Sequence, residues 1–105
     1  MVEVIWTEPA LSDLDAIADY IALENPVAAK RLVRRVFKHV DQLRDHPKSG
    51  SKPGELEHWS YRQIIEPPCR IFYRFDEKQV FILHVMRSEQ PFRESELKRG
   101  GGRES

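Results

Sequence analysis

Two apolar stripes with helical spacing fill the first half of the sequence, and only about two or three residues link them. The first stripe is Leu11, Leu14, Ile17, Ala18 and Ile21, and the second is Ala29, Leu32, Val33, Val36, Phe37, Val40 and Leu43. Each stripe predicts an amphipathic helix, because residues three and four positions apart share one helix face. Asn25 and Pro26 suit the N-cap and first turn of the second helix. Since the link is so short, we expect an antiparallel helical hairpin.

Strand-like runs flank this hairpin. One run, residues 2–7, precedes it, and three follow it at residues 61–66, 70–75 and 80–87, after a loop over residues 48–59. Their tight spacing predicts an antiparallel meander, and the last run, apolar on both sides, is expected to be central. The predicted fold is therefore α+β, in the order β-α-α-β-β-β, with the hairpin packed on one face of a small antiparallel sheet and the other face partly open.

The length of 105 residues predicts one domain, which we place at residues 1–97, with a flexible glycine-containing tail at 98–105. The formal net charge is zero, but the charges are segregated. Residues 1–29 carry six acidic residues and no Lys or Arg, whereas residues 30–52 carry eight Lys and Arg against two Asp. We expect the basic face of the second helix to be solvated and neutralised by the acidic first helix, and nucleic-acid binding is the alternative.

Several function classes are excluded by what the sequence lacks. No apolar run approaches the roughly 18 residues of a membrane span, and no signal pattern opens the chain, so we expect a cytoplasmic protein without a membrane partner. Cys69 has no second cysteine to pair with, and the four histidines lack metal-ligand spacing. No metal and no cofactor are expected.

Basic residues recur along the predicted strands and the loop before them. The candidates for a cationic concavity that binds a partner or phosphates are Arg62, Arg70, Arg74, Arg87, Lys48 and Lys52. Guanidinium groups bind phosphates through paired hydrogen bonds, which is why these residue types suggest that chemistry. Strict alternation places Arg87 on one face with Phe81, Leu83 and Val85. The alternative is a set of solvated arginines paired with carboxylates such as Glu66.

Several ordered segments together resemble the RelE/ParE superfamily of type II toxins, over residues 3–92. They are Val4 to Ala10, Asp13 to Ile21, Asn25 to Ala29, Pro47 to Gly50, Tyr61-Arg62, Arg70 to Phe75, and Val85 to Arg87. The resemblance implies a small bacterial toxin, associated with plasmid stabilisation. It also implies a co-expressed ParD-like antitoxin that covers the toxin, and a homo-oligomer within that complex.

Two activities occur in this superfamily. RelE-like members are ribosome-dependent mRNA interferases that need no metal, and ParE-like members inhibit DNA gyrase. Arg62 and Arg87 match positions where the ribonucleases place cationic stabilisers, but Gln90-Pro91-Phe92 stands where those enzymes usually carry a Tyr or His as the acid. Phenylalanine has no transferable proton, so we assign no catalytic residue.

The resemblance therefore favours a ParE-like toxin that stabilises the cleaved-DNA complex of gyrase and is not an enzyme. The first alternative is a RelE-like, metal-independent endoribonuclease with Glu57 or His58 as its base. The second is a chain that has lost toxicity and remains an antitoxin-binding module.

Overall fold

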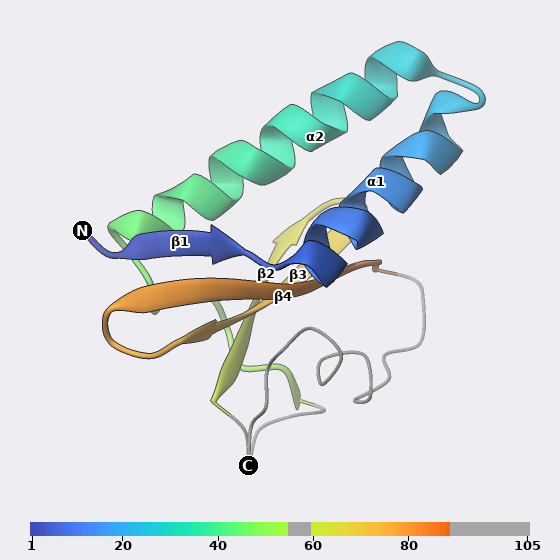
Figure 1. Cartoon of the computed structure of the whole chain (residues 1–105). Helices are drawn as coiled ribbons and strands as arrows, with labels where there is room; N and C mark the ends of the chain where they lie inside the picture. The colour runs from blue at the N-terminus through green and yellow to red at the C-terminus, as the bar shows by residue number, and fades with distance from the viewer. Residues whose placement is uncertain (55–59, 89–105) are drawn as a thin grey trace.

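The computed structural model describes residues 1–54 and 60–88. Its elements are β1 (Glu3–Trp6), α1 (Glu8–Ala22), α2 (Pro26–Asp41), the 3-10 turn η1 (Gln42–Arg44), β2 (Tyr61–Glu66), β3 (Cys69–Phe75) and β4 (Gln79–Arg87). The strands form one sheet in the order β1-β4-β3-β2, and the antiparallel helices lie together on one side of it (Figure 1). This confirms the predicted α+β fold and its element order. No helix in these two segments is long and apolar enough to cross a membrane.

The sheet is mixed, and the prediction of a wholly antiparallel sheet is wrong for β1. β2, β3 and β4 form the predicted antiparallel meander, but β1 pairs in parallel with β4, with Val4 opposite Val80 and Trp6 opposite Ile82. The short alternating run showed that a strand exists but carried no information on its direction against a partner. As predicted, β4 is central, between β1 and β3.

Side-chain caps begin both helices. The Thr7 hydroxyl accepts a hydrogen bond from the N–H of Ala10 at 3.4 Å, and Asn25 Oδ1 accepts one from the N–H of Ala28 at 3.0 Å. Each helix has a proline in its first turn, where the missing N–H costs no hydrogen bond. The predicted hairpin is confirmed, although α2 ends at Asp41 and Leu43, the last residue of the predicted apolar stripe, lies buried in η1.

The hydrophobic core lies between the helices and the sheet. Its buried side chains include Leu14, Ile17, Leu32, Val36, Val40, Ile64, Ile71, Tyr73, Val80, Ile82 and Val85. A second buried cluster, on the opposite face of the sheet, consists of Tyr61, Phe72, Leu83 and Met86. The sequence predicts a partly open second face, and this is wrong for these four side chains, which are at most 4% exposed.

An irregularity in β4 changes which of its residues share a face. Phe72 lies opposite His84 and Tyr73 opposite Ile82, so Leu83 has no counterpart in the ladder. One extra residue reverses the alternation, and Val85 therefore joins Ile82 in the core beneath the helices. The prediction that Arg87 shares a face with Phe81 and Leu83 is wrong for this reason.

α1 covers the edge of β4 beyond the end of β1. The N–H and hydroxyl of Thr7 both donate to the carbonyl of Ile82, at 3.1 and 2.7 Å, where β1 stops. Asp13 Oδ2 then accepts the N–H of Val85 at 3.1 Å and lies 2.7 Å from Nδ1 of His84, whose side chain is 3% exposed. A carboxylate on the helix thus binds a strand N–H that no neighbouring strand reaches.

We expect Asp13→Ala to lower the free energy of unfolding by about 1–3 kcal/mol, because the Val85 N–H and the buried His84 lose their shared acceptor. Urea unfolding followed by circular dichroism measures the change. Asp15→Ala is the matched control, since Asp15 is exposed on the same helix and should shift stability by no more than about 0.5 kcal/mol. Equal losses in the two variants would contradict the assigned role of Asp13.

Candidate functional site

The six predicted cationic residues do not converge on one site. Arg62 lies on the helix side of β2, the face that it shares with Ile64. Arg70 and Arg74 project from the opposite face of β3, and Arg87 ends β4 opposite Cys69. Lys48 and Lys52 belong to the segment before β2. The single cationic concavity expected from the sequence is therefore divided among separate surfaces.

Arg62 holds the segment that precedes β2. Its Nη1 donates to the carbonyl of Gly50 at 2.8 Å and to that of Lys48 at 3.3 Å. The backbone of Ser51 pairs with that of Gln63 through two hydrogen bonds, of 3.0 and 2.8 Å. Part of the loop predicted at residues 48–59 is thus fixed against the sheet, and residues 55–59 lie outside the described residues.

The phenol of Tyr73, on β3, also holds this segment in place. Its hydroxyl donates to the carbonyl of Pro47 at 2.7 Å and accepts the N–H of Gly50 at 2.9 Å. Burial raises the pKa of Tyr73 above its ordinary value, while the Gly50 N–H and the positive charge of Arg62 act in the opposite direction. Tyr73 therefore remains neutral in the folded protein over the physiological range, as its donated hydrogen bond requires.

Gly50 lies too close to the sheet for any side chain. A Cβ atom on this residue would come within 2.6 Å of both the Gln63 carbonyl oxygen and the Tyr73 hydroxyl. The spacing of Pro47 and Gly50, which contributed to the family resemblance, thus has a physical basis in their shared contact with Tyr73. Sequence reasoning did not assign that role to Tyr73, because its alternation marked it only as a core residue.

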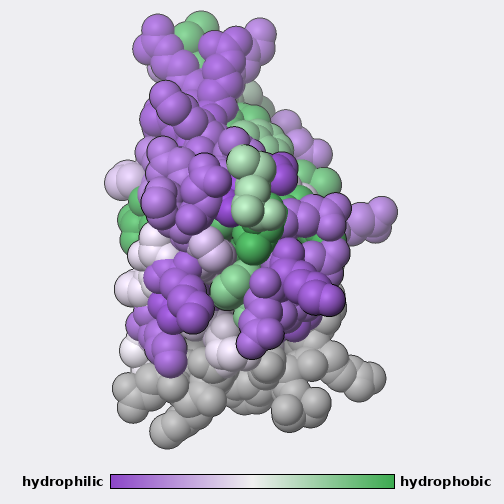
Figure 2. Space-filling view, turned by 90° about the vertical axis from the view of Figure 1, so that its left-hand side faces the viewer, coloured by the Kyte–Doolittle hydropathy of each residue, from purple (hydrophilic) through white to green (hydrophobic). Residues whose placement is uncertain are grey.

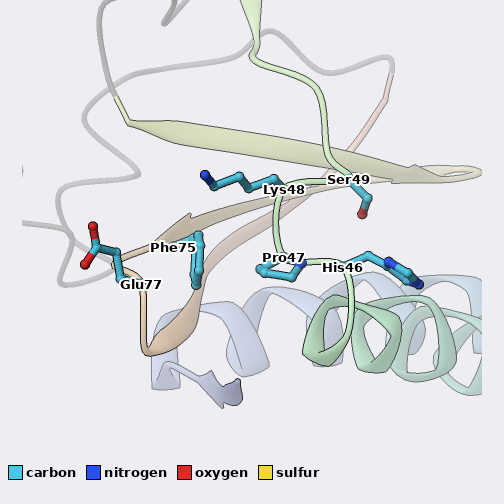
Figure 3. Close-up of a pocket in the computed structure, with 6 residues that line it drawn as sticks. All are labelled: His46, Pro47, Lys48, Ser49, Phe75 and Glu77. Carbon is cyan, nitrogen blue, oxygen red and sulfur yellow. The ribbon is translucent and has the colours of Figure 1, made fainter. Parts of the chain in front are cut away.

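A groove of about 640 Å³ lies between this fixed segment and the β3–β4 turn (Figure 3). His46, Pro47, Lys48 and Ser49 form one wall, and Phe75 and Glu77 form the other. The side chains of Lys48 and His46 point in opposite directions, and Lys48 extends toward the side where Phe75 and Glu77 lie. Of the six predicted cations, Lys48 is the one that the described lining of this groove contains.

The guanidinium groups of Arg70 and Arg74 lie over aromatic rings of the second sheet face. Arg70 stands 4.9 Å above the ring of Phe72 and donates to Gln63 Oε1 at 3.1 and 2.8 Å. Arg74 stands 4.8 Å above the ring of Phe81. The two arginines are four residues apart on one strand, about 13 Å of strand length, so both cations lie along one face of the sheet.

Arg87 lies on the helix side of the sheet, with its guanidinium carbon 5.2 Å from the ring centre of Tyr20 on α1.

Glu66, at the end of β2, accepts a hydrogen bond from Arg35 Nε at 3.2 Å and lies 3.1 Å from Nδ1 of His39. Glu66 is thus paired with α2. These two contacts join Glu66 to the helix, and they do not support the alternative that Glu66 neutralises a strand arginine.

The similarity of this chain to known proteins identifies its family. The model for "ParE toxin of type II toxin-antitoxin system, parDE" matches residues 4–92. The chain belongs to the ParE toxin family. It is 35% identical over 86 residues to "Toxin RelE2" of Caulobacter vibrioides, covering 81% of this chain and 93% of the relative. It is 39% identical over 85 residues to "Putative toxin Y4kP" of Sinorhizobium fredii, covering 81% and 86%.

Among solved structures, this ParE family toxin matches a chain of the chromosomal ParDE TA system from P. aeruginosa. The TM-score is 0.70 at 29% identity, and the match covers 85% of this chain and 98% of the other. These similarities confirm the superfamily predicted from the sequence and show that the chain is a type II toxin of the ParE family. Glu57, His58 and the Gln90-Pro91-Phe92 segment, on which the ribonuclease alternative depends, lie outside the described residues.

We expect Gly50→Ala to lower the free energy of unfolding by about 1–3 kcal/mol, because the new methyl group displaces the 47–51 segment from the sheet. Thermal or urea unfolding measures the loss. Gly54→Ala is the control, since a Cβ there meets nothing within 4 Å and should change stability by less than about 0.5 kcal/mol. If both variants unfold like the parent, the close packing of Gly50 is not a constraint.

Tyr73→Phe should reduce stability at pH 8 by about 1–3 kcal/mol, because the Gly50 N–H and the Pro47 carbonyl lose their partner. The raised pKa adds a pH signature. Tyr73 contributes stability that is fully present below its unfolded pKa of 10.0. This stability is lost as the pH rises through the higher pKa of Tyr73 in the folded protein. The difference between parent and variant should therefore narrow above pH 10 in urea titrations. A constant difference from pH 8 to 11 would count against this linkage.

Proposed function

We propose that this ParE family toxin inhibits DNA gyrase by stabilising its cleaved-DNA complex, without hydrolysing a substrate. The match of the ParE toxin model to residues 4–92 carries this proposal. An inhibitor of this kind needs surfaces that bind protein and DNA, not an acid and a base. The candidates for these contacts are Lys48, Lys52, Arg70, Arg74 and Arg87, with Arg62 holding the loop that presents Lys48.

The contacts of Arg62 support an inhibitor over a ribonuclease. A stabiliser of developing phosphate charge must aim its donors at the reacting group. Here Nη1 of Arg62 donates to two backbone carbonyls of the chain itself. Arg87, the other residue at a stabiliser position, lies on the far end of the sheet against Tyr20.

A RelE-like, metal-independent endoribonuclease is the second candidate. The identity of 35% to a protein named "Toxin RelE2" favours it. Against it stands Phe92, which occupies the region where the ribonucleases carry a proton donor. A chain that has lost both activities and only binds antitoxin is the third candidate.

A ParD-like antitoxin is the proposed partner, because the matched solved structure is of a ParDE system. We expect this antitoxin to dock an amphipathic helix and an extended segment on the toxin, acidic where it meets the arginines. The proposed complex contains more than one toxin copy, and it forms in the cytoplasm, where gyrase and ribosomes are located.

Two parallel assays distinguish the three candidates. The purified full chain is added to gyrase supercoiling and DNA-cleavage reactions, and in parallel to ribosomes programmed with a message. Gyrase inhibition with accumulation of cleaved DNA supports our proposal. Cleavage of the message supports the ribonuclease, and inactivity in both assays, with antitoxin binding retained, supports the third candidate.

Arg87→Ala is expected to weaken gyrase inhibition at least tenfold, because loss of one charged contact costs on the order of 1.5–3 kcal/mol. Stability should fall by only about 1 kcal/mol, the value of a cation–π contact such as that with Tyr20. Arg87→Lys should restore part of the inhibition if the contact is bidentate. Arg31→Ala, on the exposed face of α2, is the control and should inhibit like the parent. A folded Arg87→Ala variant with full potency would remove Arg87 from the site.

A further inference from the structure

Both walls of the groove in Figure 3 are held by hydrogen bonds within the chain. On one side, the Tyr73 phenol holds the 47–51 segment. On the other, Asp76 closes the β3–β4 turn, because its Oδ1 accepts the N–H groups of Gln79 at 2.9 Å and Lys78 at 3.2 Å. These donors lower the pKa of Asp76, so its carboxylate stays charged at neutral pH. The groove is therefore formed before a ligand arrives, which reduces the entropic cost of binding.

Glu77, in this turn, has a backbone conformation that favours glycine. Its φ is 83°, and among the described residues other than glycine it alone has a positive φ. A glycine would adopt this conformation with less strain. The Glu77 carboxylate makes no hydrogen bond or ion pair with the described residues that would offset the strain. A contact with a molecule outside the chain would explain a carboxylate at this position.

The facing wall carries a second charge without a partner. The Lys48 ammonium forms no ion pair within residues 1–54 and 60–88. Its side chain extends toward the side of Phe75 (Figure 3), and Phe75 and Pro47 add apolar rings to the lining. Figure 2 views the molecule from the side on which the β3–β4 turn lies in Figure 1, and hydrophilic side chains cover most of that side. A ligand that fits this groove combines a flat apolar part, an anionic group and a hydrogen-bond donor.

We propose that the groove binds one nucleotide, either free or unpaired in a single strand. The base rests against Phe75 and Pro47, because the flat face of a base packs on aromatic and other apolar rings. The phosphate pairs with Lys48, and an exocyclic amino group of the base donates to the Glu77 carboxylate. The groove volume of about 640 Å³ lies in the range of small-molecule sites, roughly 300–1,000 Å³.

Glu77 gives the proposed site a preference among the bases. Adenine, guanine and cytosine carry an exocyclic amino group, whereas thymine has a carbonyl oxygen in its place. An ionised carboxylate only accepts hydrogen bonds, so it binds the amino group and repels the carbonyl. The site should therefore bind dAMP more tightly than dTMP. This proposal does not rest on the gyrase target, and the titrations with nucleotides contain no gyrase, so either proposal can fail alone.

The full chain, freed from any co-expressed partner, is titrated with dAMP and with dTMP, and ¹H–¹⁵N NMR spectra report where each one binds. Shifts should appear at Ser49, Phe75 and Glu77. The dissociation constant for dAMP should lie at least roughly tenfold below that for dTMP, as the loss of a hydrogen bond to a charged group implies. Titrations with single strands of oligo-dA and oligo-dT distinguish the two sources, because an unpaired nucleotide of a strand binds more tightly in the strand than alone.

Three variants test the assigned contacts. Glu77→Gly should abolish the preference for dAMP without lowering the melting temperature, because glycine relieves the backbone strain. Lys48→Ala should weaken the binding of both nucleotides at least roughly tenfold, because the phosphate loses its charged partner. Lys78→Ala is the matched control, since it removes a cation from the turn outside the groove lining, and it should leave both dissociation constants unchanged.

Two results would overturn the proposal directly: no shift at the groove with any of these ligands, or a preference for dAMP that survives Glu77→Gly. Shifts confined to Arg70 and Arg74 would place nucleotide binding on the second sheet face and would also overturn it. If gyrase broadens the resonances of the groove and no nucleotide shifts them, the groove contacts protein, and the nucleotide site is wrong.

Discussion

The fold depends on what pairs with the side of β4 that faces away from β3. β1 pairs with the first half of this central strand, and α1 continues along the second half, where Asp13 accepts the N–H of Val85. This carboxylate adds a polar link to the apolar core between the helical hairpin and the sheet, and it satisfies a polar group that would otherwise be buried without a partner. Because α1 is fixed at this edge, α2 lies across the sheet and reaches its far side, where Arg35 and His39 meet Glu66.

A different kind of constraint shapes the region before β2. No regular ladder holds residues 47–51 along their whole length, so individual groups do so: the Tyr73 phenol, the Arg62 guanidinium and the missing side chain of Gly50. The wall of the neighbouring groove, with Lys48, is therefore positioned by residues whose side chains do not line it. Substitutions at these positions would alter the site indirectly.

The helices, the Asn25 cap and the meander could be predicted from the sequence, because periodicity and capping residues act locally. Two features could not. The parallel pairing of β1 is decided by packing across the whole chain, and the bulge at Leu83 has no glycine or proline to mark it. The candidate site was predicted least accurately, because assigning Arg87 to a face of the sheet requires knowledge of the bulge. The contacts of Arg62 and Arg70 were likewise hidden, because their partners, Gly50 and Gln63, come from other segments.

The bulge at Leu83 also gives β4 one residue more than the ladder with β3 uses. Deletion of Leu83 would restore an uninterrupted ladder, with His84 following Ile82 directly and still opposite Phe72, so Met86 and Arg87 would keep their sides of the sheet. Arg87 would stay against Tyr20, while the second apolar cluster would lose one of its four buried side chains. Residue type at this point is therefore more tightly restricted than length: a polar residue at position 83 would enter a buried cluster, whereas a one-residue gap keeps the inner and outer faces of the strand end.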